Sequence, residues 1–226
     1  MNLAVHSLSR TQLDSALSNE QAAVLVSGPE GIGLSAVVND FFATTPALVE
    51  MVLPEKDDRV DLEKGRITVD SIRRLYEQTK TVSHAQRVII IDYAERMATP
   101  AQNAFLKLLE EPPKNTRFIL LSHAPETLLP TIHSRTQHVV LQPISKEQTL
   151  ALLDELKVTD ATKRAQLMFI AEGLPALITR LSQDEKLFTA RASIVKDART
   201  FISGAPYDRL LIAKQDIERQ AGKYNV

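Results

Sequence analysis

The sequence predicts an α/β protein, with a five-stranded parallel sheet, helices on both of its faces, and a helical segment after the sheet. Three observations lead to this fold class. Short apolar runs alternate with stretches of helical period between residues 22 and 142. The glycine-rich stretch "SGPEGIGLS" (27–35) separates the first apolar run from the first helical stretch. After Pro143 the apolar runs end, and only helical periods remain.

The composition is that of a globular protein and narrows the possible functions. Of the 226 residues, 44% are hydrophobic and 24% charged, and the net charge of −1 provides no whole-chain attraction to nucleic acid. The absence of cysteine excludes disulfides and thiolate zinc sites, and the five histidines lack ligand spacing, so no metal site is expected. The sequence shows neither a signal peptide nor an apolar run of about 20 residues, and we expect a cytoplasmic protein without a membrane span.

The first part of the chain is predicted to form strand, loop, helix and strand. "AAVLVSG" (22–28) is a continuous apolar run typical of a buried parallel strand, and "LSAVVNDFF" (34–42) has helical period. "LVEMVLP" (48–54) is a second predicted strand. The charged residues that follow, through Gly65, are expected to form an exposed loop.

A helix and a third strand are predicted next. The apolar positions of the helix share one face and are Val69, Ile72, Leu75, Tyr76, Thr79 and Val82. Either Thr68 or Asp70 can cap this helix. "RVIIID" (87–92) is a strand that ends on an acid.

The stretch "TPAQNAFLKLLEEPP" (99–113) carries the clearest helix signals of the chain. We expect Thr99 to cap the helix, Pro100 to occupy its first position and Gln102 to complete a capping box. The pair Pro112–Pro113 ends it.

The remaining elements divide the chain near Pro143. "RFILLS" (117–122) and "QHVVLQ" (137–142) are the last two predicted strands, with a short helical stretch around residues 126–133 between them. Helices are predicted at 145–158, 161–173, 174–183 and 185–203, and a further one after Pro206.

The glycine-rich loop resembles a phosphate-binding P-loop whose lysine has been replaced. Gly28, Gly33 and Ser35 are in register with that motif, but Leu34 stands at the lysine position. The backbone can still form a cradle, whereas the charge that contacts the β- and γ-phosphates is lost, so tight nucleotide binding is not expected. Alternatively, the three glycines, which include Gly31, simply form a tight turn that lets helix and sheet pack closely.

Two further positions bear on nucleotide chemistry. Asp92 ends its strand where an NTPase places its Mg²⁺-binding acid, but Tyr93 follows where many such enzymes have a glutamate. Arg135, in "PTIHSRTQ" (130–137), precedes the last strand and can act as an arginine finger toward a neighbouring nucleotide. The alternative for Arg135 is a surface arginine paired with a nearby acid.

Four segments together resemble a known family. "DYAERM", "AQNAFLKLLEEPP", "FILLS" and "LLPTIHSR" occur in the order and at the spacing of the AAA+ subunits of bacterial DNA polymerase III clamp loaders, most closely the delta-prime type. The resemblance is strong over residues 20–145 and loose over 146–185. It implies an AAA+, RecA-like P-loop domain at 1–143, a helical lid at 144–185 and the start of a truncated helical collar at 186–226.

The resemblance also implies roles for individual residues. It places Gly28, Gly31, Gly33, Leu34 and Ser35 in a degenerate P-loop, Asp92 at the Mg²⁺-ligand position, Ser122 at sensor 1 and Arg135 at the arginine finger. It implies a subunit that does not hydrolyse ATP, holds no cofactor, and presents Arg135 to a neighbouring gamma/tau-like ATPase. A delta-like subunit, the sliding clamp and primed DNA are the further partners expected through the complex.

The sequence departs from the family pattern in two other places, and alternatives stay open. The four-cysteine zinc module of many relatives is missing, and Ala176 stands where the lid usually offers a sensor-2 arginine. One alternative is a competent gamma/tau-like ATPase that uses another lysine, such as Lys64 or Lys107. A free-standing DNA-binding regulator is the weakest alternative, because the charge is near neutral and no helix-turn-helix is recognisable.

Overall fold

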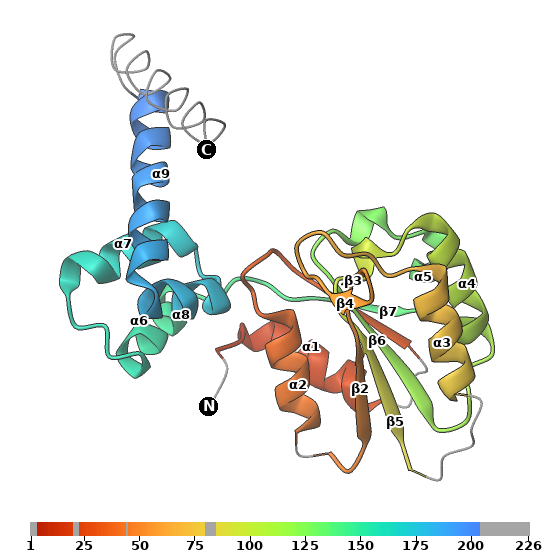
Figure 1. Ribbon diagram of the computed structural model, residues 1–226. Helices are drawn as coiled ribbons and strands as arrows, with labels where there is room; N and C mark the ends of the chain where they lie inside the picture. The colour runs from red at the N-terminus through yellow and green to blue at the C-terminus, as the bar shows by residue number, and fades with distance from the viewer. Residues whose placement is uncertain (1–3, 20–22, 44, 80–84, 204–226) are drawn as a thin grey trace, which may run out of the picture. The chain divides into compact units, whose positions relative to one another are not determined.

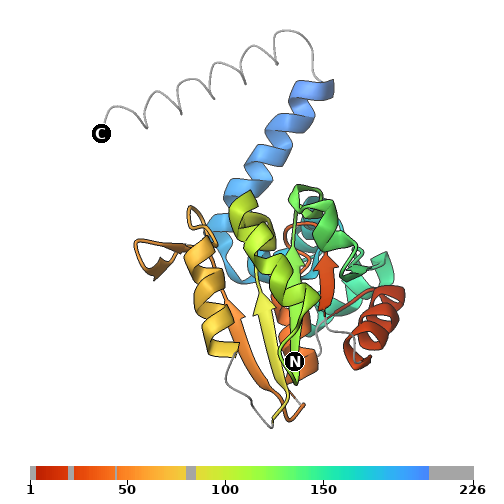
Figure 2. The ribbon, with the colours of Figure 1, turned by 90° about the vertical axis from the view of Figure 1, so that its right-hand side faces the viewer.

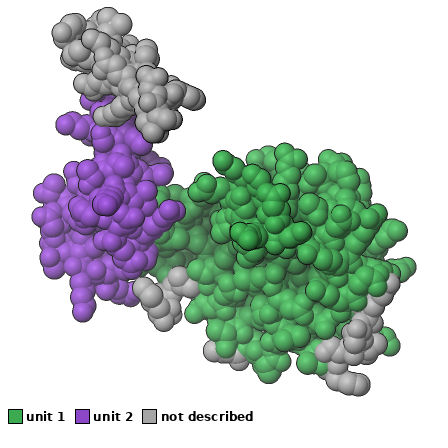
Figure 3. Space-filling view, viewed as in Figure 1, with its two compact units in different colours: residues 1–152, 173–177 green, residues 153–172, 178–226 purple. Residues whose placement is uncertain are grey.

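The computed structural model describes residues 4–19, 23–43, 45–79 and 85–203 of the chain. It separates into two compact units, coloured in Figure 3. The first comprises Met1–Leu152 together with Gly173–Leu177, and the second comprises Leu153–Glu172 together with Ile178–Val226. The division into domains at 1–143, 144–185 and 186–226 stays a prediction.

The first unit contains the expected parallel sheet of five strands (Figure 1). In sequence order these are β1 (Ala23–Ser27), β2 (Leu48–Val52), β5 (Arg87–Ile91), β6 (Thr116–Ser122) and β7 (Gln137–Val140). Their spatial order is β2-β5-β6-β1-β7, and every pairing is parallel. The apolar runs predicted the strands because a parallel sheet covered on both faces must bury successive residues on alternate sides.

Helices cover both faces of the sheet and create two separate cores. On one face lie α3 (Val69–Thr79), α4 (Thr99–Glu110) and α5 (Pro130–His133); α3 and α4 are in front of the strands in Figure 2. On the other face lie α1 (Ser7–Ser18), for which no helix was predicted, and α2 (Leu34–Phe42). Along β1, Ala23 and Leu25 point into the first core and Val24 and Val26 into the second.

The segment expected as an exposed loop after β2 instead forms a hairpin, so that prediction was wrong in part. Its strands are β3 (Glu55–Lys56) and β4 (Arg59–Val60), which pair antiparallel. Asp57 and Asp58 join them with φ angles of 51° and 57°. A two-residue hairpin turn of this hand needs positive φ at both residues, and aspartate tolerates it better than most side chains.

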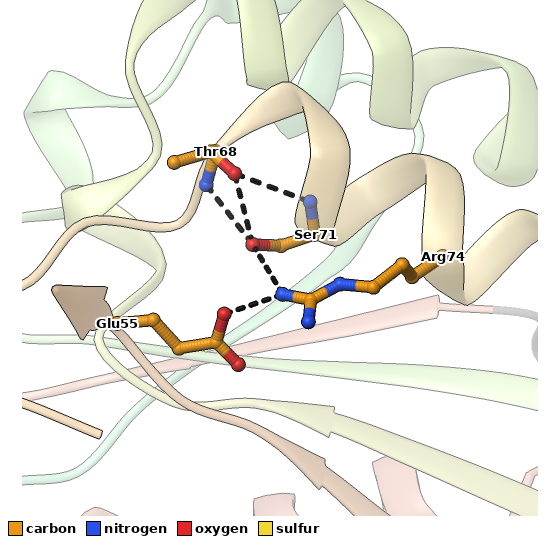
Figure 4. A network of polar contacts seen from close by, with 4 residues as sticks. All are labelled: Glu55, Thr68, Ser71 and Arg74. Carbon is orange, nitrogen blue, oxygen red and sulfur yellow. Dashed lines mark hydrogen bonds and ion pairs between the residues drawn. The ribbon is translucent and has the colours of Figure 1, made fainter. Parts of the chain in front are cut away.

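A small polar network holds the base of this hairpin against α3 (Figure 4). The Glu55 carboxylate pairs with Arg74, whose Nη2 also lies 3.4 Å from Ser71 Oγ. Thr68 Oγ1 accepts the backbone N–H of Ser71 at 3.2 Å. Thr68, rather than Asp70, therefore caps α3, and the hairpin is fastened to the helix through its first two turns.

The start of α4 differs from the expected capping box. The N-cap residue is Ala98, and it provides no side-chain cap. Gln102, which is 3% exposed, instead bridges to residues far along the chain. Its Nε2 donates to Met97 O at 3.0 Å and Thr127 O at 3.3 Å, and its Oε1 accepts Leu129 N–H at 2.7 Å. Gln102 thus ties the first turn of α4 to the segment that leads into α5.

The other predicted elements are confirmed. The short helical stretch consists of the 3₁₀ turn η2 (Pro125–Thr127) and α5, and a second 3₁₀ turn, η1 (Ala94–Arg96), follows β5. The later helices are α6 (Lys146–Glu155), α7 (Ala161–Ala171), α8 (Pro175–Gln183) and α9 (Glu185–Ser203). The helix predicted after Pro206 lies outside the described residues, and so does Val82, the last apolar position predicted for the helix that begins at Val69. Within the described ranges, no helix is both long and apolar enough to cross a membrane.

The Gln102 bridge predicts a measurable loss of stability on substitution. Gln102→Leu fills the same space with an apolar side chain. It leaves the Leu129 N–H and the carbonyls of Met97 and Thr127 without their partner. We expect the free energy of unfolding to fall by about 1–3 kcal/mol. Urea denaturation measures this loss, and the exposed neighbour offers a matched control in Asn103→Ala, which should change stability by no more than about 0.5 kcal/mol. Equal stability of both variants would contradict the bridge.

Candidate functional site: a P-loop without a cation

The glycine-rich loop connects β1 to α2 and contains two residues that require glycine. Gly31 and Gly33 both have a φ of +92°, where a side chain is strained. Gly33 is the residue immediately before α2, so the loop leads directly into a helix N-terminus. The loop therefore has the backbone form of a phosphate cradle, with Gly28, Gly33 and Ser35 where the motif expects them.

The lysine position of the motif points into the protein core. Leu34, the first residue of α2, is 2% exposed and packs with Val37, Val38 and Ile32 against the sheet. A side chain in this place fills core volume and does not reach toward a phosphate. An ammonium group there would have to be buried among hydrocarbon, which is costly without a partner.

The two groups that would hold Mg²⁺ in a working P-loop are bonded to each other. Ser35 Oγ donates a hydrogen bond to Asp92 Oδ2. Asp92 is buried, and its other oxygen accepts the backbone N–H of Tyr93 at 3.0 Å. The hydroxyl keeps its lone pairs in this bond, so the Ser35–Asp92 pair does not itself prevent metal binding, and the feature that fits MgATP poorly is the missing cation at Leu34.

The surroundings of Tyr93 are acidic. Tyr93 adopts a left-handed backbone with φ 54° and packs edge-on against the ring of His123, with the ring centroids 5.8 Å apart. Burial raises the pKa of the Tyr93 hydroxyl, and the negative charges of Asp92, Glu30 and Glu95 raise that pKa further. Arg96 opposes them as the smaller influence. Carboxylates near the loop repel a triphosphate, so the local field adds to the loss of the lysine.

Ser122 and His123 join the end of β6 to the loop. Ser122 is fully buried, its Oγ accepts the Ala124 N–H at 3.2 Å, and its carbonyl accepts the Gly28 N–H at 3.3 Å. His123 Nδ1 donates to the Gly28 carbonyl at 2.8 Å, and its backbone N–H reaches Glu95 at 3.3 Å. The structure thus brings together the loop, Asp92 and Ser122 at one edge of the sheet, as the sequence predicted.

A short segment of the first unit, residues 173–177, covers the loop. Leu177 N–H donates to the Gly31 carbonyl at 3.0 Å. A Cβ built on Gly31 would lie 2.9 Å from Leu177 Cβ, and one on Gly33 would lie 3.2 Å from Ala176 Cβ. Beside the loop, an apolar hollow between Val5, Ile32, Leu141 and Pro175 is too narrow to hold a water molecule. Residues 173–177 therefore pack directly against the turn made by Gly31 and Gly33.

Arg135 lies at the opposite edge of the sheet. It precedes β7 by two residues, and in the sheet Gln137 is level with Val24 while Val140 is level with Ser27, where the loop begins. At about 3.3 Å per residue, β7 alone puts about 10 Å between Gln137 and the level of Ser27, and Arg135 lies in the turn before that strand. The structure therefore does not bring Arg135 to the chain's own P-loop.

Arg135 is paired with an acid that sequence reasoning did not identify. Its Nη2 lies 2.8 Å from Glu110 Oε1, and the two side chains are 35% and 51% exposed. Its Nη1 donates to Thr131 O at 3.1 Å and to Ser134 Oγ at 3.2 Å. Glu110 and Leu177 carry no local signal, because each meets its partner from a distant part of the chain.

Comparison with solved structures defines the fold class. The structure matches RuvB of Thermotoga maritima with a TM-score of 0.59 at 13% identity, over 80% of this chain and 61% of that one. It matches a Walker-type ATPase of Pyrococcus abyssi with a TM-score of 0.54 at 12% identity, over 96% of this chain and 76% of that one. With its five-stranded parallel sheet and glycine loop, the chain has the α/β P-loop fold of AAA+ proteins.

Sequence comparison is more specific. The family model described as "DNA polymerase III, delta subunit" matches residues 43–145. DNA polymerase III subunit delta' of Bacillus subtilis is 31% identical over 140 residues, which are 62% of this chain and 41% of that protein. Subunit delta' of Escherichia coli is 36% identical over 157 residues, 67% of this chain and 46% of that protein. The match thus spans less than half the length of these relatives, and within it the chain is similar to clamp-loader delta' subunits.

The burial of Leu34 predicts that restoring a lysine does not restore a nucleotide site. Leu34→Lys should lower the free energy of unfolding by at least about 2 kcal/mol, because it removes packing and buries an amine. Leu34→Met, the matched control, should cost less than about 1.5 kcal/mol. Neither variant should bind a fluorescent ATP analogue saturably at micromolar concentration. A stable Leu34→Lys protein that binds MgATP would contradict the account of the loop.

The histidine beside the loop strand predicts a pH dependence of stability. His138 Nε2 lies 2.7 Å from Ser27 Oγ, and the ring packs edge-on against His133. Burial, followed by the charge of His133, lowers the pKa of His138. As the pH falls, His138 therefore takes up its proton in the unfolded chain before it does so in the folded chain. The contribution of neutral His138 to the free energy of unfolding is complete above about pH 6.5 and is lost as the pH falls through the folded pKa.

Unfolding by urea between pH 7.5 and pH 5 measures this effect. The free energy of unfolding should decline over that range, and His138→Gln should make the decline shallower. A slope that is the same in both proteins would show that another group is responsible.

Proposed function

We propose that this chain acts as a non-catalytic, delta-prime-like subunit of a bacterial DNA polymerase III clamp loader and presents Arg135 to the nucleotide of a neighbouring ATPase subunit. The observation that carries the proposal is the position of Arg135, at the sheet edge opposite to the chain's own P-loop. An arginine in this position can serve nucleotide chemistry only on another molecule. The similarity to delta' subunits supports the same assignment.

The chemistry required of Arg135 is electrostatic. In phosphoryl transfer, negative charge on the transferred group is stabilised by an arginine supplied in cis or in trans. The guanidinium is permanently charged and offers a planar fork that matches two phosphate oxygens. Arg135 is partly exposed, so a phosphate on a neighbouring subunit can approach it.

The chain's own loop would take no part in hydrolysis. Leu34 supplies no charge, Ser35 and Asp92 are bonded to each other, and residues 173–177 rest on the loop. These features favour a retained scaffold over a site that binds ATP, and we propose no cofactor for this chain.

The proposed partners are the other components of the loader: a gamma/tau-like ATPase, a delta-like subunit, the sliding clamp and primed DNA. The relatives include a subunit gamma/tau of Mycobacterium tuberculosis, 39% identical over 87 residues, and replication factor C subunit 3 of Saccharomyces cerevisiae, 29% identical over 130 residues. Such matches are expected if the subunits of a clamp loader share one fold and occupy equivalent positions in the complex.

The alternative, a gamma/tau-like ATPase with a substitute lysine, is less well supported. Lys107 lies in the last turn of α4, at the end of that helix farther from the carboxyl edge of the sheet. Lys64 is exposed beside the hairpin, where its backbone N–H bonds to Asp61. Neither lysine replaces the side chain at position 34.

A reconstituted clamp loader tests the proposal. Arg135→Ala should lower the ATP turnover that clamp and primed DNA stimulate by about tenfold or more, because a finger in trans is worth several orders of magnitude at one site. Assembly of the complex, followed by gel filtration, should be unchanged. Arg73→Ala is the matched control, since Arg73 is also an exposed arginine paired with an acid, Asp70.

Unchanged turnover in the assembled Arg135→Ala complex would refute the proposal. Saturable, Mg²⁺-dependent ATP binding with turnover by the isolated chain would instead establish the alternative.

A further inference from the structure

Helix α4 contacts the segment that carries Arg135 at both ends of the helix. In the first turn, Gln102 bonds to Thr127 and Leu129, directly before α5. In the last turn, Glu110 bonds to Arg135, directly after α5. The segment between these two attachments is short and is therefore held along the whole of one rigid helix.

The contacts of Arg135 leave part of its guanidinium unused. Nη1 donates to Thr131 O and Ser134 Oγ, and Nη2 donates once, to Glu110. An arginine has five N–H donors. The Nε–H and one Nη2–H of Arg135 meet no acceptor in the described part of the chain. These donors remain for an anion, and the charged guanidinium is a strong donor to phosphate oxygens.

The place of Glu110 is not explained by the stability of its helix. The carbonyl end of a helix carries partial negative charge, so a carboxylate in the last turn is unfavourable there. Glu110 is in the last turn of α4, and its charge is compensated by Arg135. The next residue, Glu111, is equally exposed but forms no ion pair within the described ranges.

We infer that Glu110 is a positioning residue, which holds the Arg135 guanidinium so that its unused N–H donors meet a phosphate group on a neighbouring molecule. This inference rests on the proposed function of Arg135. A free arginine side chain loses much rotamer freedom when it binds, and a side chain already held in place loses less. The Arg135–Glu110 ion pair is half-exposed, so it is weak enough to orient the guanidinium while leaving it able to bind a phosphate.

The test uses a reconstituted clamp loader with five variants of this chain: Glu110→Ala, Glu110→Gln, Glu111→Ala, Arg135→Ala and the double variant of Glu110→Ala with Arg135→Ala. We expect Glu110→Ala to lower kcat for stimulated ATP hydrolysis by about two- to fivefold, the range for an exposed pair, with KM for ATP unchanged. Glu110→Gln keeps an acceptor and should recover part of the loss. Glu111→Ala should match the wild type, and adding Glu110→Ala to Arg135→Ala should have no further effect.

A second measurement reports on Arg135 directly. In the full-length isolated chain, the ¹⁵N signal of the Arg135 side chain, assigned by its loss in Arg135→Lys, should be ordered in the wild type and in Glu111→Ala. In Glu110→Ala it should become mobile on the ps–ns timescale. The thermal midpoints of Glu110→Ala and Glu111→Ala should be equal, which separates positioning from a general loss of stability.

The outcomes are distinguishable. If Arg135→Ala lowers turnover but Glu110→Ala leaves kcat unchanged or raises it, Glu110 does not position Arg135 and the inference fails. If Arg135→Ala itself has no effect, the proposed function fails, and the ¹⁵N measurement alone decides whether Glu110 orders the arginine.

Discussion

Parallel strand pairing is the constraint on which the functional geometry of this protein depends. Because all five strands run the same way, every residue that follows a strand lies at one edge of the sheet and every residue that precedes a strand lies at the other. The glycine loop and Asp92 follow strands, Ser122 ends one, and all three are gathered at the carboxyl edge. Arg135 precedes β7 and lies at the amino edge, where the last turn of α4 also ends. The glycine loop and Arg135 therefore lie at opposite edges of the sheet, and Arg135 does not contact the loop of its own chain.

At the carboxyl edge, the loop keeps the glycines of a phosphate site but lacks the positive charge of the lysine. Gly31 and Gly33 keep the left-handed turns, yet Leu34 is packed into the core, and the charges that act on Tyr93 beside the loop are mostly carboxylates. Ser35 and Asp92 satisfy each other, and Leu177 satisfies the Gly31 carbonyl. Several polar groups of the loop region are therefore bonded within the chain.

Local pattern was enough to predict most elements, because the period of buried residues is a local property. The strand at 117–122 and the helix at 185–203 follow directly from it. What local pattern missed was long-range. Gln102 was interpreted as part of a capping box, but its partners are 25 and 27 residues away. The hairpin at 55–60 contains too few residues for any period, and the pairs Glu110–Arg135 and Gly31–Leu177 exist only once the chain has folded.

The burial of Leu34 has a consequence for the evolution of such a loop. A lysine at this position would meet a packed apolar environment, and residues 173–177 lie against the same turn. A single mutation at position 34 would therefore introduce a buried amine before it introduced a phosphate contact. A loop of this kind regains a lysine only if its apolar neighbours change as well.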